Sequence, residues 1–193
     1  MAGDSPHRGE VGAERWAKVK LLALDVDGTL TEGALTFDGA GKLYQTFNVR
    51  DGFGLVAARR AGLIVAWISG RASEVAERRF EELGLHHCIL ACADKAAALR
   101  ALQEQHQLTP DQCCFVGDDL PDLPAFAVCG LKVAVADADP FVLARADWIT
   151  SKRGGQGAVR EVVEAILGAQ GQWQILLDRF TRADWTQHEN LQK

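Results

Sequence analysis

The sequence predicts an α/β fold, a Rossmann-like doubly wound parallel sheet with a small β-hairpin inserted after the first strand. Short apolar runs alternate with amphipathic helical segments from residue 19 to residue 167. The runs are nearly continuous in apolar residues, which is typical of strands buried on both faces. The length of 193 residues, with 48% hydrophobic and 24% charged residues, fits one globular domain with tails.

The elements follow one another in strand–helix order. We predict strands at residues 20–25, 64–69, 87–90, 113–117, 132–135 and 148–150. The amphipathic segments predict helices at residues 52–61, 72–83, 95–105, 120–128, 140–145 and 158–167. Residues 34–47 interrupt this order, because Asp38-Gly39 is a turn signal and residues 43–47 alternate apolar and polar side chains. This pattern predicts the hairpin, which needs a surface to pack on because an isolated hairpin is only marginally stable in water.

We predict that the chain has three parts. Residues 1–18 form an N-terminal lead with a helix near residues 13–18, residues 19–171 form the domain, and residues 172–193 form a C-terminal tail. The tail carries apolar side chains, among them Trp173, Phe180 and Trp185, that need a partner. We expect a helix docked on its own domain, with contact to another subunit as the alternative.

Composition restricts the class of protein. A net charge of −5 argues against a nucleic-acid or anionic-membrane partner. The chain has no apolar stretch of membrane-spanning length and no secretory signal near its first residue. Its 5 cysteines are odd in number and contain no CxxC pair, which favours a reduced, cytoplasmic protein with buried thiols.

Asp25 and Asp27 end the first predicted strand and are the first candidate site. Residues two apart in a strand point to the same face, and Gly28 lets the backbone turn sharply after them. Two converging carboxylates repel each other, and a bound Mg²⁺ would compensate while leaving positions open for phosphate. One Asp could then attack phosphorus while the other moves protons. The competing interpretation is an ordinary Asx turn at a strand end.

Ligands of doubly wound sheets bind beyond the carboxyl ends of the strands, so the other strand ends matter as well. Ser69, Gly70 and Arg71 end the second strand, where a hydroxyl and backbone N–H groups at a helix N-terminus could hold phosphate oxygens. The alternative is a simple helix cap. Lys95 opens a helix, a position that the helix dipole disfavours, which indicates pairing with phosphate and a nucleophile. The alternative is a solvated surface lysine.

A run of acidic residues follows the strand at residues 113–117. Asp118, Asp119 and Asp122 together invite Mg²⁺, although an acidic helix N-terminus would have the same sequence. The ordered set DxDGT, SGR, a helix-opening Lys and GDDxxD resembles the haloacid dehalogenase-like phosphohydrolase superfamily.

The resemblance implies a role for each motif residue. Asp25 would be the nucleophile that forms an aspartyl-phosphate, and Asp27 the general acid and base. The metal ligands would be Asp25, Asp118 and the backbone carbonyl of Asp27, and Ser69 and Lys95 would bind the phosphate. An Asp in the acid/base position favours hydrolysis of phosphate esters over cleavage of carbon–halogen bonds.

Members of this superfamily select substrates with inserted caps. Neither the segment between Asp27 and Ser69 nor that between Lys95 and Asp118 is long enough for a cap domain. The chain is therefore similar to capless members, in which the substrate is a macromolecule or a neighbouring subunit closes the site.

Three further segments favour an active site that a neighbouring subunit closes. Residues 47–52 (FNVRDG), 133–138 (VAVADA) and 154–162 (GGQGAVREV) closely resemble the 3-deoxy-D-manno-octulosonate 8-phosphate phosphatases, a family of lipopolysaccharide precursor synthesis. The resemblance implies an eight-carbon acidic sugar phosphate as substrate and a homotetramer with its hairpins assembled at the centre. It also implies a glycine-rich segment that reaches a neighbour's active site.

The family also implies a set of substrate-side positions. These are Asp27, Asn48, Val49, Arg50, Asp51, Gly52, Gly70, Arg71, Arg79, Lys95 and Asp119. Arg is suited to bidentate contacts with carboxylate or phosphate, although Arg79 could equally lie on a solvated helix face. Val56 and Gln156 stand where the family often has Arg, and these departures leave the exact sugar open.

Other functions stay open at this level. The nearest is hydrolysis of a nine-carbon 3-deoxy-nonulosonate 9-phosphate, which needs the same chemistry and a slightly longer pocket. A capless phosphatase with a macromolecular substrate and a non-catalytic oligomerisation module are further alternatives. A monomer would favour the macromolecular substrate, and loss of Asp27 or Lys95 would indicate the module, but both residues are present.

Overall fold

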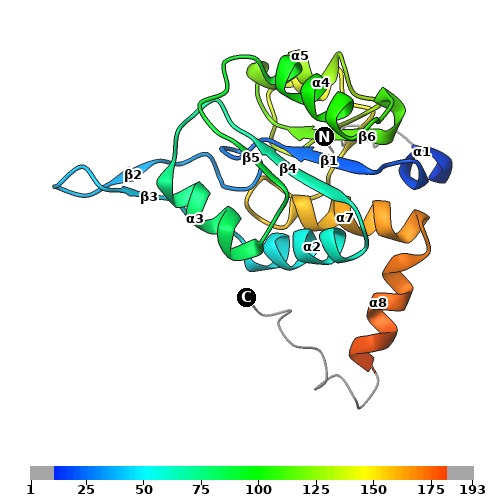
Figure 1. Ribbon diagram of the computed structural model, residues 1–193. Coiled ribbons are helices and arrows are strands. Elements are labelled where there is room, and N and C mark those ends of the chain that lie inside the picture. The colour runs from blue at the N-terminus through cyan, green and yellow to red at the C-terminus, as the bar shows by residue number, and fades with distance from the viewer. Residues whose placement is uncertain (1–10, 182–193) are drawn as a thin grey trace, which may run out of the picture.

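A six-stranded parallel sheet forms the centre of the protein, as the computed structural model shows for residues 11–181 (Figure 1). The strands lie in the order β5-β4-β1-β6-β7-β8. Their bounds are β1 (Leu21–Leu24), β4 (Ile64–Ile68), β5 (His87–Ile89), β6 (Cys113–Gly117), β7 (Leu131–Ala134) and β8 (Trp148–Ile149). All of β1 is buried, because helices cover both faces of the sheet. The α/β fold predicted from the sequence is confirmed.

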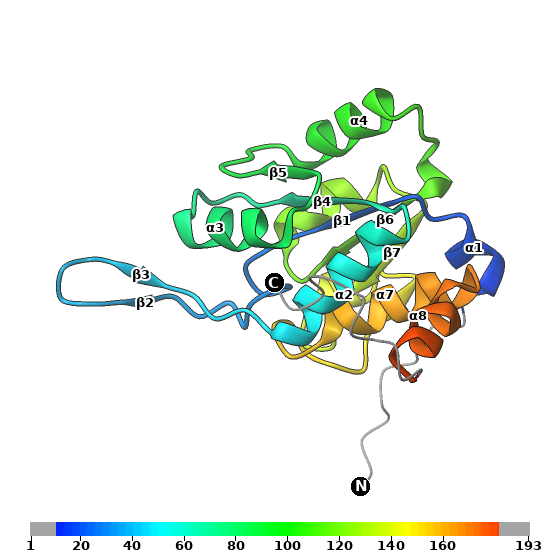
Figure 2. The same cartoon turned by 60° about the horizontal axis from the view of Figure 1, so that its bottom comes forward.

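Helices form the two outer layers. One face is covered by α2 (Val49–Arg60), α3 (Glu74–Leu83) and α7 (Ala158–Ala169), and the other by α4 (Lys95–Gln105) and α5 (Leu123–Phe126) (Figures 1 and 2). The short helix α6 (Pro140–Leu143) and two 3₁₀ turns, η1 (Pro110–Gln112) and η2 (Leu120–Asp122), lie in the connections.

The strand order reverses beside β1. Leu24 at the end of β1 pairs with Trp67 of β4 on one side and with Val116 of β6 on the other. The loops that follow β1 and β6 therefore diverge from the sheet at neighbouring points. In open α/β sheets this switch point is where ligands bind.

Several helix ends differ from the predicted ones for local reasons. Helix α2 begins at Val49, because the Asn48 side chain accepts a hydrogen bond from the Arg50 N–H and caps it. Helix α3 begins at Glu74, after its cap Ser73. The predicted helix at residues 120–128 is broken into η2 and α5, where Pro121 and Pro124 each lack the N–H that a continuous helix needs.

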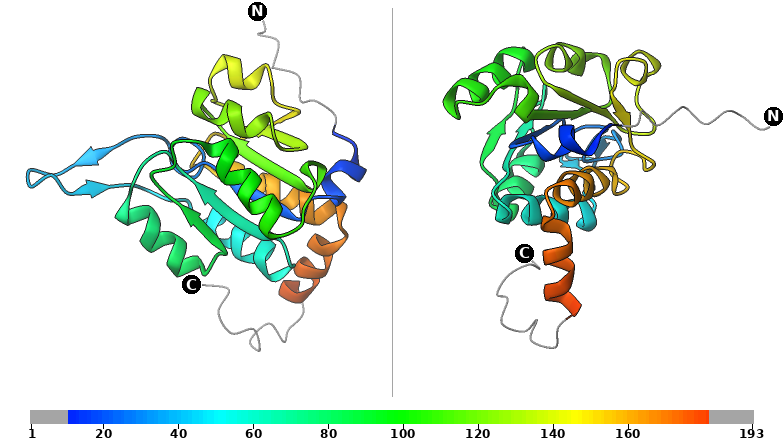
Figure 3. Two further views of the ribbon diagram at one scale, coloured as in Figure 1. Left: turned by 45° about the horizontal axis from the view of Figure 1, so that its top comes forward. Right: turned by 90° about the vertical axis from the view of Figure 1, so that its right-hand side faces the viewer.

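The predicted hairpin consists of β2 (Thr36–Phe37) and β3 (Leu43–Tyr44), which pair antiparallel. It projects away from the body of the protein (Figures 1 and 3). Leu35, Phe37 and Tyr44 are exposed on it. At its base Phe47 stacks on the buried Trp67, with ring centroids 5.8 Å apart. The base of the hairpin is thus anchored while its tip is free to meet another surface.

Both ends of the described chain contact the domain. In α1 (Ala13–Ala17), within the predicted lead, Trp16 is buried and meets the edge of Trp148 at 5.2 Å. Helix α8 (Gln172–Thr181) places Trp173 and Leu176 against the core. Trp185 of the predicted tail lies outside the described residues. Within the part of the chain that the structure describes, no helix has the length and apolar character to cross a membrane.

Candidate active site

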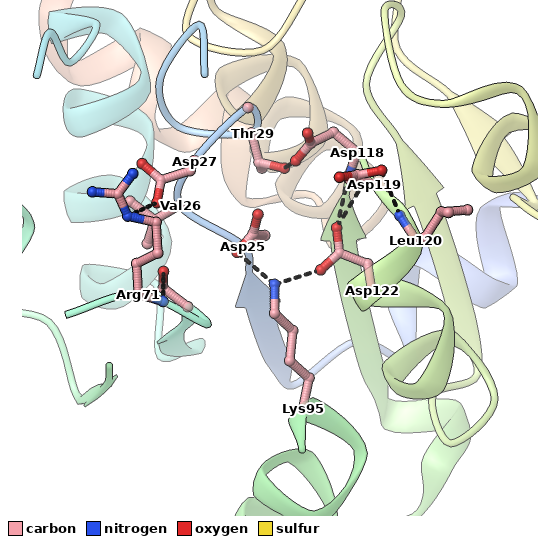
Figure 4. A network of polar contacts seen from close by, with 12 residues as sticks. Asp25, Val26, Asp27, Thr29, Arg71, Lys95, Asp118, Asp119, Leu120 and Asp122 are labelled. Atoms are coloured by element: carbon pink, nitrogen blue, oxygen red, sulfur yellow. Dashed lines mark hydrogen bonds and ion pairs between the residues drawn. The ribbon is translucent and has the colours of Figure 1, made fainter. Parts of the chain in front are cut away.

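Three carboxylates converge at the switch point of the sheet. Asp25 follows β1, Asp118 follows β6, and Asp122 closes η2 in the same connection (Figure 4). One oxygen atom from each of these side chains lies within 4.8 Å of the others. The parallel strands therefore bring together side chains that are almost 100 residues apart in the sequence.

Lys95 lies inside this acidic cluster. Its Nζ donates to Asp25 Oδ1 at 2.6 Å and to Asp122 Oδ1 at 2.7 Å (Figure 4). The lysine is only 5% exposed, so the alternative of a solvated surface lysine is wrong. It starts α4, whose cap Asp94 accepts a hydrogen bond from the Ala97 N–H. The helix thus directs the ammonium group across the sheet edge to the predicted nucleophile.

The cluster carries more negative charge than Lys95 neutralises. Burial and the neighbouring Asp122 raise the pKa of Asp25 to about 6. Burial, Asp25 and Asp122 raise the pKa of Asp118 to about 8. Burial alone would lower the pKa of Lys95, but Asp25 and Asp122 outweigh it and raise that pKa. A cation between Asp25 and Asp118 would relieve this repulsion.

Asp118 is held from the β1 loop. Thr29 Oγ1 donates to Asp118 Oδ1 at 2.9 Å. Gly28 adopts a φ of +94°, and a Cβ at this position would lie 2.0 Å from Asp118 Oδ2. Gly28 therefore allows both the left-handed turn and the close approach of the Asp118 carboxylate.

Asp122 is fully buried; the acidic run put it forward for Mg²⁺, but it is not among the ligands that the family resemblance implied. Its Oδ1 accepts from Lys95, and its Oδ2 accepts from the N–H groups of Asp118 at 2.8 Å and Asp119 at 3.2 Å. Because both oxygens are engaged, Asp122 orients Lys95 and the β6 loop. Of the three carboxylates that could hold a metal ion, Asp25 and Asp118 are therefore the stronger candidates. The spacing of Asp122, four residues after Asp118, was the available sequence signal.

Asp27 points away from the acidic cluster (Figure 4). Gln45 Nε2 donates to its Oδ1 at 2.6 Å, and Arg71 Nε lies 3.8 Å from its Oδ2. The Asp27 side chain is 20% exposed. Solvent or a bound molecule therefore reaches this carboxylate, whereas Asp25 and Lys95 are almost fully enclosed.

The SGR motif is placed beside Asp27, with one correction. Ser69 is buried, and its Oγ accepts from the Arg71 N–H at 3.2 Å. It does not stand at a helix N-terminus as predicted, because Ser73 caps α3 through the Ala76 N–H. Gly70 and, in the β6 loop, Asp119 are exposed near these strand ends, where Asp119 Oδ1 accepts from the Leu120 N–H.

The FNVRDG segment supports the neighbouring backbone. Asn48 Nδ2 donates to the Gly155 carbonyl at 3.2 Å. Asp51 is 1% exposed, and its carboxylate accepts from the N–H groups of Gly157 and Arg160 at the start of α7. Burial is the main reason why the pKa of Asp51 is raised. This corrects the expectation that Asp51 faces a substrate, since its oxygens are occupied by the protein.

The remaining predicted substrate-side residues lie around the start of α2. Val49 and Arg50 are exposed. Arg79 of α3 pairs with Glu82 at 2.7 Å, and a Cβ on the buried Gly52 would lie 2.3 Å from an Arg79 Nη atom. The structure thus places Gly52 and Arg79 against each other.

The glycine-rich segment packs on the β1 loop of its own chain, and its reach to a neighbour's active site stays a prediction. Gly155 N donates to the Thr29 carbonyl at 3.0 Å. A Cβ on Gly154 would lie 1.6 Å from the Gly28 carbonyl oxygen. Gly154 N donates to Asp137 Oδ1 at 3.0 Å, so the VAVADA segment holds the other side of this loop.

The two departures from the family pattern lie in different environments. Val56 is buried in α2 as part of the core, and Gln156 is exposed in the glycine-rich segment. An Arg at position 56 would have to leave the core to reach a ligand, whereas position 156 is open to one.

Known proteins resemble this chain over most of its length. A family model described as haloacid dehalogenase-like hydrolase matches residues 89–162. The 3-deoxy-D-manno-octulosonate 8-phosphate phosphatase KdsC of Escherichia coli strain K12 is 42% identical over 166 residues, covering 84% of this chain and 88% of that protein.

Solved structures show the same similarity to these phosphatases. The 3-deoxy-D-manno-octulosonate 8-phosphate phosphatase of Moraxella catarrhalis, in complex with magnesium ion, phosphate ion and KDO, is 39% identical with a TM-score of 0.85. It covers 88% of this chain and 97% of its own. A hypothetical protein, XCC2798 from Xanthomonas campestris, is 45% identical with a TM-score of 0.87 and covers 94% of this chain and 100% of its own. The chain therefore belongs to the 3-deoxy-D-manno-octulosonate 8-phosphate phosphatase family of haloacid dehalogenase-like hydrolases.

Proposed function

We propose that this protein is a Mg²⁺-dependent phosphatase that hydrolyses 3-deoxy-D-manno-octulosonate 8-phosphate to the free sugar acid and phosphate, in lipopolysaccharide precursor synthesis. The observation that carries the proposal is the enclosed pair of Asp25 and Lys95, with Asp118 and Asp122 beside it at the switch point. Relatives at about 40% identity carry this activity in their names.

The donor set fits Mg²⁺. Carboxylate oxygens are the ligands that Mg²⁺ prefers, and the raised pKa values of Asp25 and Asp118 indicate that a cation between them would favour their ionised forms. We assign the metal to these two carboxylates and to the backbone carbonyl of Asp27. When bound, the ion would neutralise charge on the transferring phosphoryl group and on the nucleophile.

Asp25 acts as the nucleophile in this proposal. One carboxylate oxygen forms a bond to phosphorus while the bond from phosphorus to the sugar oxygen breaks. Lys95 holds the same carboxylate and donates hydrogen bonds to the phosphoryl oxygens, and Ser69 contributes its hydroxyl. Asp122 keeps Lys95 in place, so that charge is positioned before the reaction begins.

Asp27 moves the protons. As a carboxylic acid it gives its proton to the departing sugar oxygen, and as a carboxylate it takes a proton from the water that attacks the phosphorus of the aspartyl-phosphate. This second step frees the Asp25 carboxylate and returns Asp27 to its acid form. The partial exposure of Asp27 toward Arg71 suits a group that must meet both a leaving group and a water.

The exposed side chains around Asp27 are suited to the sugar acid. We propose that Arg71 contacts the substrate and that Gly70 and Asp119 line its path, since all three are accessible near the strand ends. Val49, Arg50 and Gln156 are also exposed and would meet the sugar from the other side. Asn48, Asp51, Gly52 and Arg79 would act indirectly by holding α2 and the glycine-rich segment.

We further propose a homotetramer formed through the hairpins, in which a neighbouring subunit completes the active site. An isolated hairpin with Leu35, Phe37 and Tyr44 exposed needs a surface to cover it. Sedimentation of the wild type and of Phe37→Asp tests the proposed tetramer. A wild-type tetramer that Phe37→Asp dissociates supports the proposal, and a wild-type monomer contradicts it.

The five free thiols support a reducing, cytoplasmic location.

Phosphate release from a panel of sugar phosphates tests the proposed substrate. The eight-carbon and nine-carbon keto-deoxy acid esters should be compared with simple sugar phosphates, with Mg²⁺ and with EDTA. A strong Mg²⁺-dependent preference for the eight-carbon ester is expected. Preference for the nine-carbon ester would keep the chemistry and change the substrate, and release without any divalent ion would contradict the metal site.

A further inference from the structure

We propose that Gln45, at the base of the hairpin, is a positioning residue for Asp27, and that it couples the hairpin to the proton-transfer step. The inference rests on the proposed function, because it assigns a role in that reaction. Gln45 Nε2 donates to Asp27 Oδ1 at 2.6 Å. Asp27 is the predicted acid and base, so the contact reaches a reacting group.

The amide of Gln45 is fixed at both ends. Its Oε1 accepts a hydrogen bond from the Ser73 hydroxyl. Ser73 is itself buried and held, since its Oγ accepts from the Ala76 N–H at 3.2 Å as the cap of α3. Because an amide oxygen accepts and an amide nitrogen donates, the bond to Ser73 turns the N–H₂ group toward Asp27. The chain of contacts therefore runs from α3 through Gln45 to the carboxylate.

The base of the hairpin is also fixed in place. Phe47, two residues after Gln45, stacks on the buried Trp67 at 5.8 Å. Gln45 directly follows β3 and is half-buried between the exposed Tyr44 and Thr46. Gln45 therefore lies between the paired residues of β3 and the anchored Phe47, which together limit its movement.

The two carboxylate oxygens of Asp27 have different partners. Oδ1 is held by Gln45, whereas Oδ2 lies 3.8 Å from Nε of Arg71, whose side chain is 38% exposed. We infer that Gln45 holds one oxygen so that the other is presented to the leaving group and the water. Without this contact only the 3.8 Å ion pair with Arg71 would orient the carboxylate, and fewer encounters would have the geometry for proton transfer.

The experiment compares two classes of phosphate ester. An alkyl phosphate such as the sugar ester needs a proton on its leaving oxygen, whereas p-nitrophenyl phosphate leaves as a stable anion and does not. The value of kcat/KM reports the steps through departure of the leaving group. Gln45→Ala should therefore lower kcat/KM for the sugar ester by about tenfold, a fraction of the roughly 10²–10⁴-fold that a general acid contributes, and change that for the aryl ester less than about threefold.

Further variants separate positioning from folding. Gln45→Glu keeps the size of the side chain but replaces the donor by a carboxylate that repels Asp27, so it should be at least as impaired as Gln45→Ala. Ser73→Thr keeps the hydroxyl and should retain activity, whereas Ser73→Ala should show the same selective loss as Gln45→Ala. Thr46→Ala is the matched control, because this neighbour of the half-buried Gln45 is exposed.

The experiment distinguishes failure of the positioning role from failure of the proposed function. If the wild type hydrolyses no phosphate ester, the proposed function fails. If the wild type is active but Gln45→Ala and Gln45→Glu leave both esters unchanged, or slow both equally, the positioning role is overturned. A selective loss on the sugar ester with an unchanged KM supports it.

Discussion

Lys95 Nζ lies 2.6 Å from Asp25 Oδ1, and this pair is enclosed by the sheet edge, with side-chain exposures of 5% and 9%. An ion pair at this depth costs desolvation energy that is returned only where both partners are fully hydrogen-bonded. Asp122 supplies the second acceptor for the lysine. The arrangement thus places a fixed positive charge where a phosphoryl group would meet the nucleophile.

Replacing Lys95 tests that placement. Lys95→Met keeps the length of the side chain and removes its charge, and we expect kcat to fall by about 10²–10³-fold, the usual effect of losing a preorganised electrostatic contact. Steady-state phosphate release measures it. Lys18→Met is the control, because Lys18 forms only an exposed pair with Asp111 at 3.6 Å and should retain full activity. Equal activity of both variants would remove Lys95 from the mechanism.

Asp122→Asn tests the support of the lysine. The amide keeps an oxygen for the N–H groups of Asp118 and Asp119 but turns an N–H₂ group toward Lys95, which can accept nothing. We therefore expect kcat to fall by at least about tenfold, as for a displaced electrostatic contact, with Mg²⁺ affinity changed much less. Titration of activity against Mg²⁺ separates the two effects, and a loss confined to metal affinity would show that Asp122 is a ligand instead.

Metal binding and stability should both depend on pH. Burial raises the pKa of Asp118 from 3.8 to about 8, so between these values the folded metal-free protein binds more protons than the unfolded chain. Its free energy of unfolding should therefore fall as the pH rises from about 4 to 8. Mg²⁺ competes with this proton, so its Kd should decrease over the same range, by up to about tenfold per pH unit.

Urea unfolding with EDTA and calorimetric Mg²⁺ titration check the two trends. Asp118→Asn should flatten the pH dependence of unfolding and abolish tight Mg²⁺ binding. A metal-free protein that becomes more stable between pH 5 and pH 8 would contradict this assignment of the charge.

Gly154 tests the contact between the glycine-rich segment and the β1 loop. A Cβ at this position would lie 1.6 Å from the Gly28 carbonyl oxygen, so Gly154→Ala must displace one of the two loops. We expect an activity loss of about 10²-fold, as for other misplacements of a catalytic group by about 1 Å. Phosphate release at saturating substrate measures it.

Gly168→Ala is the matched control for Gly154→Ala. Gly168 lies within α7 with no atom near the position of its Cβ, so the substitution should stabilise the protein by about 0.5–1 kcal/mol and leave activity unchanged. Full activity of Gly154→Ala would indicate that the two loops are not packed as described.

The sequence was sufficient for the fold and for the location of the site. Continuous apolar runs and their terminal polar residues, such as Asp25 and Asp118, predict a buried parallel sheet and its ligand edge, because both depend on local patterns. Lys95 was predictable from its unfavourable place at a helix start. These inferences needed only the order of strands and helices.

Side-chain partners distant in sequence were not predictable. Asp51 accepts N–H groups more than 100 residues away, at Gly157 and Arg160, so no local pattern distinguishes it from a substrate ligand. Asp122 accepts a hydrogen bond from Lys95 only because η2 places its side chain beside the lysine. The choice of Ser73 over Ser69 as the cap of α3 depends on the loop length after β4.

The most direct test of the central claim is rapid-quench analysis with substrate labelled at its phosphate. The proposed mechanism predicts transient, hydroxylamine-labile label on the protein, mapped to the peptide that contains Asp25, formed and lost at least as fast as kcat and absent from folded Asp25→Asn. Label that never appears during turnover, or label on another residue, would contradict Asp25 as the nucleophile.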